Sequence, residues 1–405
     1  MYFGIENLNM RARSSANFSL DDLPRIVSTC KGYGLKSYLT LNTIIYDGDL
    51  PLMRRIVDAS KVCGVSAVIA CDMSVIEYAH NAGMPVHIST QANVSNSEAV
   101  RFYSRYANVV VLARELNLFQ VKEIYDYIRT NNICAPDKEL VQIEMFCHGA
   151  LCMAIAGKCY LSLHASGASA NKGACYQLCR RSYSARDNET GFGLSLESNY
   201  IMSPKDLCTI EFLPAMLDAG VRIFKIEGRA RPAEYVKKTC ECYDRAFKAI
   251  EAGAYDGRLT AALLEELRTV FNRGFWSGYY QGAEIGQWSN VYGSQATRTK
   301  TYVARATHYF SKIGVGEFLI EAGAVKNGDN VMVTGAKTGV AEFAVEGIRI
   351  GGEAMPAGRA CKGQIITIPV PCKIRLSDKM YIWGENKNVK RNENENVKNE
   401  KTLPV

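Results

Sequence analysis

Short apolar runs alternate with longer amphipathic segments over the first 230 residues of the chain. The apolar runs have the length and the β-branched content of strands, and they cover residues 37–41, 67–70, 86–90, 109–113, 141–146 and 221–227. The amphipathic segments have apolar positions at helical spacing, most clearly over residues 20–33, 50–63 and 118–130. Strands that alternate with helices of this length predict βαβ units around a parallel sheet.

Polar residues stand at the ends of most of these strands, namely Asn42, Asp72, Gln91, Arg114, His148 and Arg229. In a (β/α)8 barrel such positions lie at the C-terminal mouth, where active sites are built. We therefore expect an α/β fold with a TIM-like (β/α)8 barrel. An open doubly wound sheet is the competing architecture, but the sequence has no glycine-rich dinucleotide-binding loop to favour it.

The strands that can be placed are one too few for such a barrel. Together with a short run at residues 2–4, seven strands precede Arg229, and the stretch 199–203 is ambiguous. A closed barrel of this class needs eight strands. The first strand and helix of the barrel are therefore expected to be missing.

Three further segments depart from this alternation. Residues 147–208 form an insertion rich in Cys, Gly, Ser and Ala, and residues 299–383 carry short alternating strands separated by glycine turns. The second pattern predicts a small all-β barrel or sandwich. Residues 384–405 are polar and of low complexity, so we expect a disordered tail. The expected domains are residues 1–298, residues 299–383 and the tail.

Composition narrows the class of protein. The 405 residues are 47% hydrophobic and carry a net charge of +7, which is typical of a globular protein and permits a polyanionic partner. No run of about 18 apolar residues predicts a membrane span, and the N-terminus has no pattern of a signal peptide. Fourteen cysteines without an export signal indicate a reducing compartment, so we expect a cytoplasmic protein without structural disulfides.

Four cysteines of the insertion have a spacing of their own, and a fifth follows some thirty residues later. The pattern is Cys152-x6-Cys159-x15-Cys175-x3-Cys179, with Cys208 beyond it and glycines on every side. A structural zinc site usually shows tight C-x2-C pairs, which are absent here. An iron–sulfur cluster accepts ligands from separate loops. Spacing alone leaves an iron–sulfur cluster, a zinc site and no metal as open readings.

The residues around these cysteines closely resemble the signature of peptidase family U32. The matching stretches, in chain order, are Leu8-Asn9-x-Arg11-Ala12-Arg13, His87-Ile88-Ser89-Thr90-Gln91-Ala92-Asn93, Leu112-Ala113-Arg114-Glu115, Glu144-x-Phe146-x-His148-Gly149-Ala150-Leu151-Cys152, Gly157-Lys158-Cys159, Asn171-x-Gly173-x-Cys175-x-Gln177-x-Cys179-Arg180-Arg181, Ser203-x-Lys205-Asp206-Leu207-Cys208 and Lys225-Ile226-Glu227-Gly228-Arg229. The resemblance extends over nearly the whole chain, to about residue 380.

The resemblance implies a TIM-like barrel that carries a [4Fe–4S] cluster and hydroxylates its substrate without oxygen, with prephenate as the hydroxyl donor. Members of the family act on a tRNA wobble uridine, a ribosomal RNA cytidine or a ubiquinone precursor, and some are described as collagen-degrading peptidases. The added C-terminal β region resembles the branch that forms 5-hydroxyuridine in tRNA, so tRNA is the expected partner. Family members usually have a strand and a helix before the run at residues 2–4, which agrees with the strand count.

The resemblance also implies roles for individual residues. Prephenate has two carboxylates, and arginine binds carboxylates through paired hydrogen bonds. The expected substrate-binding residues are Arg13, Gln91, Arg114, Arg180 and Arg229. The expected catalytic residues are His87, His148 and Glu144, with either histidine as a proton shuttle. The expected cluster ligands are Cys152, Cys159, Cys175 and Cys208, with Cys179 as the substitute for one of them.

Two other classes of function stay open at the level of sequence. A peptidase needs an activated nucleophile or a metal-bound water, and the chain has neither an H-E-x-x-H nor a G-x-S-x-G motif. A cysteine peptidase that uses His87 or His148 is nevertheless compatible with the sequence. A non-catalytic RNA-binding module is the third reading. For an enzyme that modifies RNA, we expect RNA contacts from basic and aromatic residues such as Arg273, Phe275, Trp276 and Tyr280, with a flipped uridine stacked on one of these rings.

Overall fold

The computed structural model describes residues 1–13, 17–190, 193–194, 200–282, 286–289, 291, 293–354 and 358–386. The chain forms two compact units. The first unit comprises Met1–Ala230, Ala246–Ala261 and Asn272–Ser294. The second comprises Arg231–Arg245, Ala262–Phe271 and the chain from Gln295 onward, so it includes two helical segments that lay within the first expected domain.

A parallel sheet forms the centre of the first unit, as the alternating pattern predicts. Six strands pair in chain order, and a seventh, β10, pairs in parallel with β6. These strands are β1 (Tyr2–Gly4), β2 (Tyr38–Leu41), β3 (Ala67–Ala70), β4 (Val86–Ile88), β5 (Val109–Val111), β6 (Gln142–Gly149) and β10 (Val221–Ile226). The wholly apolar strands β3 and β5 are buried along their full length, which is typical of parallel strands covered on both faces.

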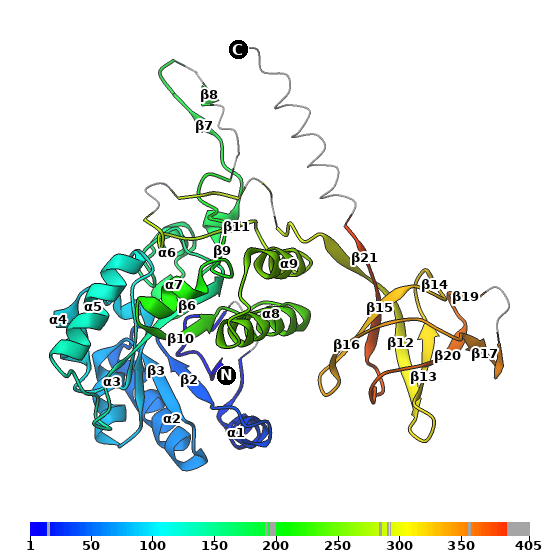
Figure 1. Ribbon diagram of the computed structural model, residues 1–405, viewed down its shortest axis with the longest axis horizontal. Helices are drawn as coiled ribbons and strands as arrows, with labels where there is room; N and C mark the ends of the chain where they lie inside the picture. Colours follow the sequence, from blue (N-terminus) through cyan, green and yellow to red (C-terminus); the bar gives the residue numbers. More distant parts are fainter. Residues whose placement is uncertain are drawn as a thin grey trace. The chain divides into compact units, whose positions relative to one another are not determined.

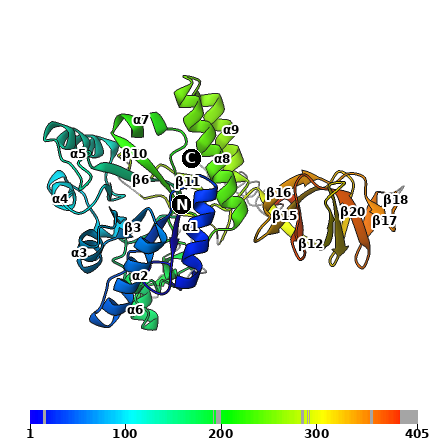
Figure 2. The same cartoon turned by 90° about the horizontal axis from the view of Figure 1, so that it is seen from below.

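Helices cover the outer side of these strands (Figures 1 and 2). They are α1 (Leu23–Gly32), α2 (Leu50–Cys63), α3 (Met73–Asn81), α4 (Ser97–Tyr103), α5 (Leu118–Thr130) and α7 (Leu213–Asp218). The predicted helices over residues 50–63 and 118–130 are confirmed at both ends. Local chemistry explains these ends, because Asn117 accepts a hydrogen bond from the backbone of Gln120 and Gly64 takes a left-handed conformation after α2.

The parallel sheet does not close into the expected eight-stranded barrel. Its two outer strands are β1 and β10, and no backbone pairing joins them among the described residues. A side chain links them instead, since the Tyr2 hydroxyl donates a hydrogen bond to the carbonyl oxygen of Ile226 at 3.3 Å. Residues 200–203 of the ambiguous stretch contain no strand, and residue 199 lies outside the described residues.

The insertion extends the sheet beyond the ends of the parallel strands. Strand β9 (Asp206–Cys208) pairs antiparallel with the last residues of β6, and β11 (Phe275–Trp276) pairs in parallel with β9. Helix α6 (Leu161–Ser166) and the two-stranded hairpin β7 (Ala185–Arg186) and β8 (Gly193–Leu194) complete the insertion. The alternation of strands and helices therefore stops where the sequence predicts it.

The second unit contains a separate antiparallel β region. Eight strands pair in the order β16-β15-β21-β12-β13-β20-β17-β18, and β14 pairs with β19. Their bounds are β12 Arg298–Phe310, β13 Val315–Ile320, β14 Ala324–Lys326, β15 Asn330–Gly335, β16 Gly339–Ala344, β17 Arg349–Ile350, β18 Glu353–Ala354, β19 Arg359–Cys361, β20 Ile365–Pro369 and β21 Lys379–Glu385. The all-β prediction holds, but the described strands do not pair into a closed barrel.

Two longer helices precede this β region in the chain, α8 (Ala233–Glu251) and α9 (Gly257–Arg268). The core of the β region is apolar and centres on Phe318, which is fully buried. Of the expected tail, residues 384 and 385 belong to β21 and residues 387–405 lie outside the described residues. No helix in the described part of the chain has the length and apolar character needed to cross a bilayer.

Candidate functional site

A cavity of about 120 Å³ lies at the C-terminal ends of the parallel strands. Residues that end or follow five of these strands line it, including Asn42 after β2, Gln91 after β4, Arg114 after β5 and Arg229 after β10. The sequence therefore predicts correctly that these positions gather at one edge of the sheet, which is where α/β proteins bind their ligands.

A larger hollow, of about 1150 Å³, lies at the opposite ends of the strands. It is lined by the first residues of several strands, such as Tyr38 and Gln142, and by His87, but no cysteine contributes to it among the described residues. Active sites of parallel α/β folds lie at the carboxyl ends of the strands. We therefore take the smaller cavity as the candidate site.

Four cysteines line the small cavity: Cys152, Cys159, Cys175 and Cys179. Burial raises the pKa of the Cys179 thiol, Arg180 opposes this rise, and the thiols of the other three cysteines add to it. The four side chains are therefore close enough to interact electrostatically. Cys208, an expected ligand, is elsewhere: it is buried in β9, where its Cα pairs with that of His148, and it does not line the cavity.

The four thiols form a donor set that can be compared with the needs of a single metal ion and of a cluster. As placed, no three His, Cys, Asp or Glu side chains of the described residues form a site for one metal ion. A structural zinc site brings all four ligands to one ion at about 2.3 Å. In a [4Fe–4S] cluster the four thiolates bind different iron atoms, so their sulfur atoms stay farther apart. Four thiols line this cavity, and thiolates are the usual ligands of an iron–sulfur cluster, so the residues present fit such a group.

The cysteine segment is attached to the loops that follow β1 and β2. The backbone N–H of Arg13 donates to the carbonyl oxygen of Gly173 at 3.3 Å, and that of Ile44 donates to Asn171 at 3.2 Å. Gly173 has a φ of +80°, and an added Cβ would lie 2.3 Å from the carbonyl oxygen of Asn9. Glycine is therefore required here both by conformation and by the close approach of two backbones.

Arg11, rather than Arg13, reaches the cavity. Arg11 lines it, whereas Arg13 is exposed and borders a separate surface hollow. Burial lowers the pKa of Arg11, but attraction to Glu227, Cys152, Tyr2 and Cys175 outweighs it and gives a net rise. The two arginines are two positions apart in an irregular loop, where no periodicity indicates which one points inward.

Arg114 also borders the cavity, and its guanidinium contacts a backbone carbonyl and an aromatic ring. Its Nη1 donates to the carbonyl oxygen of Ala150 at 3.1 Å, and its guanidinium carbon lies 4.3 Å from the centre of the Phe146 ring. Its Nε is buried and has no hydrogen-bond partner. A buried donor without an acceptor is costly and indicates a site where a ligand can supply one.

The other two expected arginines differ in their surroundings. Arg229 lines the cavity, and its Nη2 donates to the side-chain oxygen of Asn9 at 2.5 Å. Burial lowers the pKa of Arg229, while Glu227 raises it. Arg180 does not line the cavity. It donates to the carbonyl oxygens of Pro204 and Leu151, both at 2.5 Å, so it fastens the backbone of the insertion.

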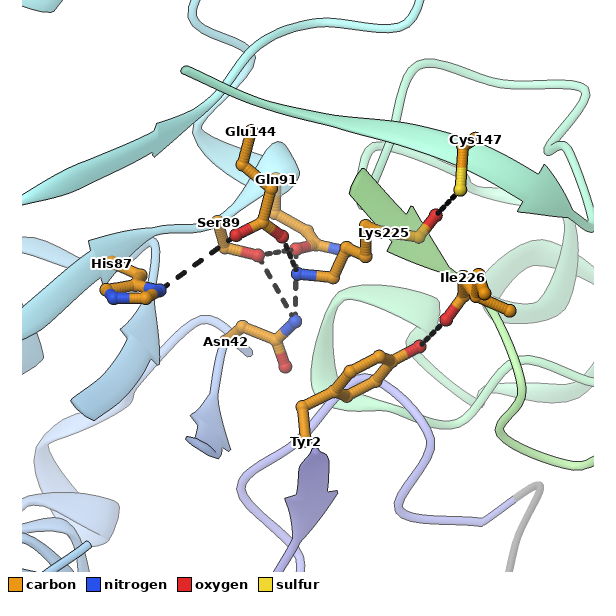
Figure 3. Close-up of polar contacts among 9 residues, drawn as sticks. All are labelled: Tyr2, Asn42, His87, Ser89, Gln91, Glu144, Cys147, Lys225 and Ile226. Carbon is orange, nitrogen blue, oxygen red and sulfur yellow. Dashed lines mark hydrogen bonds and ion pairs between the residues drawn. The ribbon is translucent and has the colours of Figure 1, made fainter. Parts of the chain in front are cut away.

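A buried ion pair joins β6 to β10 beneath the cavity. Lys225 Nζ lies 2.6 Å from Glu144 Oε1, and both side chains are at least nine-tenths buried. Lys225 lines the cavity, whereas Glu144 lies behind it (Figure 3). Lys225 was not among the expected site residues, although it lies near the end of β10, two positions before Glu227 and four before Arg229.

His87 lies on the far side of Glu144 and faces the larger hollow. Its Nδ1 lies 3.9 Å from Glu144 Oε2 and has no hydrogen-bond partner. Burial lowers its pKa from 6.5 to about 4, with Lys225 and Lys36 acting in the same direction and Glu144 against it. His87 is therefore neutral near pH 7 and does not touch the cavity.

Gln91, which follows β4, is placed differently from His87, which lies within that strand. Its side-chain oxygen accepts hydrogen bonds from Asn42 Nδ2, at 3.1 Å, and from the Ser89 hydroxyl (Figure 3). This network fixes three polar side chains at the cavity wall. His148, by contrast, is buried beside Phe275, with 5.4 Å between the ring centres, and is not among the residues that line the cavity.

The close approach at Gly173 gives a first prediction. Gly173→Ala should lower the free energy of unfolding by at least ~3 kcal/mol, because it adds a backbone clash to the strain of a left-handed residue. Gly167→Ala is the matched control, since Gly167 also has a positive φ, +63°, but has nothing within 4 Å of an added Cβ. It should cost only about 1 kcal/mol. Equal losses for the two variants in urea unfolding would contradict this packing.

The neutral His87 gives a second prediction, on pH dependence. Between about pH 6.5 and pH 4 an unfolded histidine binds a proton that folded His87 does not, so the stability of the protein falls as the pH falls through this window. His87→Phe should reduce that loss by about 3 kcal/mol. The control His164→Gln alters an exposed histidine and should leave the profile unchanged. A wild-type profile in His87→Phe would show that His87 titrates normally.

Comparisons with known proteins identify the family of the chain. The model of the family described as Peptidase family U32 matches residues 1–290. A Porphyromonas gingivalis protein named Collagenase is 55% identical over 381 residues, which cover 94% of this chain and 92% of the relative. The 23S rRNA 5-hydroxycytidine C2501 synthase of Escherichia coli is 37% identical over 282 residues, covering 68% of this chain and 41% of the relative. The tRNA hydroxylation protein P of Escherichia coli is 27% identical over 430 residues, covering 93% and 90%. The family match spans well over half of the chain, which therefore belongs to peptidase family U32.

Proposed function

We propose that this protein is an iron–sulfur enzyme that hydroxylates a pyrimidine of RNA, most specifically the wobble uridine of tRNA at C5. Its hydroxyl donor in this proposal is prephenate, and molecular oxygen is not required. One observation carries the proposal: four cysteine thiols and four basic side chains, Arg11, Arg114, Lys225 and Arg229, line a single cavity. Such a combination suits a cluster that works next to an anionic small molecule.

Cys152, Cys159, Cys175 and Cys179 would hold a [4Fe–4S] cluster, since thiolates are its usual ligands. When bound, the cluster would supply one-electron transfers, and the donor, which gives up its hydroxyl group and takes a hydrogen in exchange, would be the two-electron oxidant in place of oxygen. Arg11 is attracted to Cys152 and Cys175, so it is well placed to offset the negative charge of the thiolates. Cys208 has no place in this ligand set, because β9 keeps it away from the cavity.

Arg114 is the best candidate for binding a carboxylate of the donor. Its buried Nε has no acceptor, and its contacts are to a backbone carbonyl and to an aromatic ring, not to an acid. Arg229 also lines the cavity, and its guanidinium donates hydrogen bonds to Asn9, Asn17 and Thr40. Two arginines on different strands match the two carboxylates of a molecule such as prephenate.

Lys225 is the group that can deliver a proton to a ligand in the cavity. Its ammonium group is oriented by Glu144 behind it, at 2.6 Å. His87 continues this row of polar side chains toward the larger hollow, although the 3.9 Å gap to Glu144 is too long for a direct hydrogen bond. In this proposal His87 and Glu144 act through Lys225 and do not contact the substrate.

The RNA part of the proposal is supported by two relatives whose names describe hydroxylation of RNA. The tRNA hydroxylation protein P matches over about nine-tenths of both chains, whereas the ribosomal RNA enzyme is much longer than this chain. The length match favours tRNA as the substrate. The net charge of +7 is compatible with a polyanionic partner.

A peptidase is the second candidate, and a relative at 55% identity that is named Collagenase favours it. A cysteine peptidase requires a thiol with a neighbouring general base, usually histidine. No histidine lines the cavity in the described part of the chain, and His87 faces the other hollow. The geometry therefore supports hydroxylation better. A non-catalytic RNA-binding module would leave the four thiols without a role.

The ligand set gives a third prediction. Serine substitution of Cys152, Cys159, Cys175 or Cys179 should each abolish most of the iron bound by the anaerobically purified protein. Cys208→Ser is the matched control and should retain iron, because Cys208 does not line the cavity. Iron and acid-labile sulfide would be measured per chain. If Cys208→Ser loses iron while Cys179→Ser keeps it, the ligand set is wrong.

The fourth prediction tests the activity. A deletion strain should lose 5-hydroxyuridine-type nucleosides from its tRNA, as measured by mass spectrometry, and the wild-type gene should restore them. Arg114→Ala should fail to restore them while binding a normal amount of iron, because Arg114 contacts the donor and not the cluster. Arg13→Ala is the control and should restore them, since Arg13 lies outside the cavity. Unchanged tRNA nucleosides in the deletion strain, together with gelatin cleavage by the purified protein, would favour the peptidase.

A further inference from the structure

A second, smaller pocket adjoins the cavity and has an aromatic wall. It measures about 50 Å³, and its lining includes Trp276, Tyr279, Gly286, Trp288, Glu115 and Arg114. We call this the aromatic pocket. Arg114 and Cys152 also line the cysteine cavity, together with Met153, Ala154 and Ala156. A ligand in the aromatic pocket would therefore be separated from a ligand in the cavity only by these shared side chains.

The aromatic wall is held by regular backbone contacts. Trp276 belongs to β11, which pairs with β9, and Trp288 forms an isolated bridge with Pro204. Between them, Tyr280 is buried and its hydroxyl donates to the carbonyl oxygen of Phe146 at 3.0 Å. Tyr280 is thus an anchor for this segment and not the exposed RNA contact that the sequence suggests. Trp276 and Tyr279 meet edge to face, with 5.3 Å between their ring centres.

Two hydrogen-bond donors in the wall lack acceptors. The indole N–H of Trp276 is buried and has no hydrogen-bond partner, and Trp276 as a whole is only 6% exposed. Nε of Arg114 is also buried and has no hydrogen-bond partner. Leaving a buried donor unpaired costs about 1–3 kcal/mol. Both groups can only donate, so a ligand that satisfies them must present acceptor atoms.

Gly286 keeps the pocket open. An added Cβ at Gly286 would lie 3.3 Å from the Tyr279 hydroxyl and 3.7 Å from the Trp288 ring. Its backbone is not in the left-handed region, so the position does not require glycine for conformational reasons. A larger side chain at this position would fill the pocket without straining the backbone.

We propose that the aromatic pocket is the subsite for the pyrimidine base that this enzyme modifies. The inference rests on the proposed function and names the residues that bind its acceptor. A uracil ring offers flat faces for stacking on the indole rings and a carbonyl oxygen for the unpaired indole N–H of Trp276, whereas Nε of Arg114 is left for the carboxylate of the hydroxyl donor. A pocket of about 50 Å³ admits one edge of such a ring and leaves the ribose and phosphates outside.

The neighbouring cavity explains why a base would bind here. Arg114 forms part of both walls, so the donor that it holds on one side lies next to the base on the other. A base presented in this way must leave its stack in the RNA, and enzymes that modify bases generally require this. An aromatic or prolyl side chain of a peptide is the competing occupant, and competition between a gelatin peptide and an oligonucleotide distinguishes the two.

The three tryptophans of the chain allow a direct binding assay. Trp276 and Trp288 line the pocket, whereas Trp383 lies in β21 of the second unit. The fluorescence of the full-length protein should therefore be quenched by a short single-stranded oligouridylate. Trp276→Phe keeps an aromatic ring but removes the N–H, and it should weaken binding roughly tenfold. Gly286→Leu should abolish binding, and Trp383→Phe should leave the affinity unchanged.

Circular dichroism of each variant would establish that it is folded. Unchanged oligouridylate affinity in both Trp276→Phe and Gly286→Leu would overturn the inference, as would displacement of oligouridylate by a proline-rich gelatin peptide at lower concentration. Hydroxylation of tRNA by Gly286→Leu at the wild-type rate would reject the pocket but keep the proposed function. Pocket-dependent oligouridylate binding with no hydroxylated product would reject the proposed function but keep the pocket as a base-binding site.

Discussion

The close contact between the cysteine segment and the loop after β1 is the constraint on which the site depends. At Gly173 the backbone of the segment comes so near to Asn9 that a single added carbon would lie 2.3 Å from a carbonyl oxygen. Hydrogen bonds from Arg13 to Gly173 and from Ile44 to Asn171 fasten the segment on both sides of this point. Without this attachment Cys175 and Cys179 would not face Cys152 and Cys159 across the ends of the parallel strands.

The charges of the site follow from this placement. Thiols brought together in a partly buried cavity disfavour ionisation unless positive charge is near, and the raised pKa of Cys179 shows this cost. Arg11 comes from the loop to which the segment is attached, so the same contact brings the compensating charge. Lys225 is paired with Glu144, whereas Arg114 keeps an unsatisfied donor at the cavity wall. The site is thus built to bind negative charge.

The sequence indicates which edge of the sheet carries the candidate site, but not which side chains line the cavity. Strand β3 and helices α2 and α5 were predicted with their observed bounds, because their apolar periodicity is strong and their ends carry caps. The short helices α3 and α4 were missed, since segments of nine and seven residues give little periodic signal. The prediction of a mixed α/β fold with a parallel sheet is confirmed, whereas a closed barrel is not found in the described residues.

Three of the expected site residues, Arg13, Cys208 and His87, do not line the cavity, and each for a different reason. No pattern in the sequence distinguishes Arg11 from Arg13, and only the tertiary structure shows that Arg11 lines the cavity. Cys208 follows a motif that matches the family, but it lies in an antiparallel strand that the βα pattern does not predict. His87 lies within β4 rather than after it, so its side chain is next to Glu144 and lines the larger hollow instead of the cavity. Lys225 could have been found from its spacing to Glu227.

The origin of the transferred oxygen tests the central claim most directly. Purified protein would be incubated without oxygen with tRNA and with prephenate that carries ¹⁸O in its ring hydroxyl group, and the tRNA nucleosides would be analysed by mass spectrometry. The account predicts that the label appears in a 5-hydroxyuridine-type nucleoside. A hydroxylated nucleoside whose oxygen comes only from molecular oxygen, in a parallel reaction under ¹⁸O-labelled gas, would contradict it.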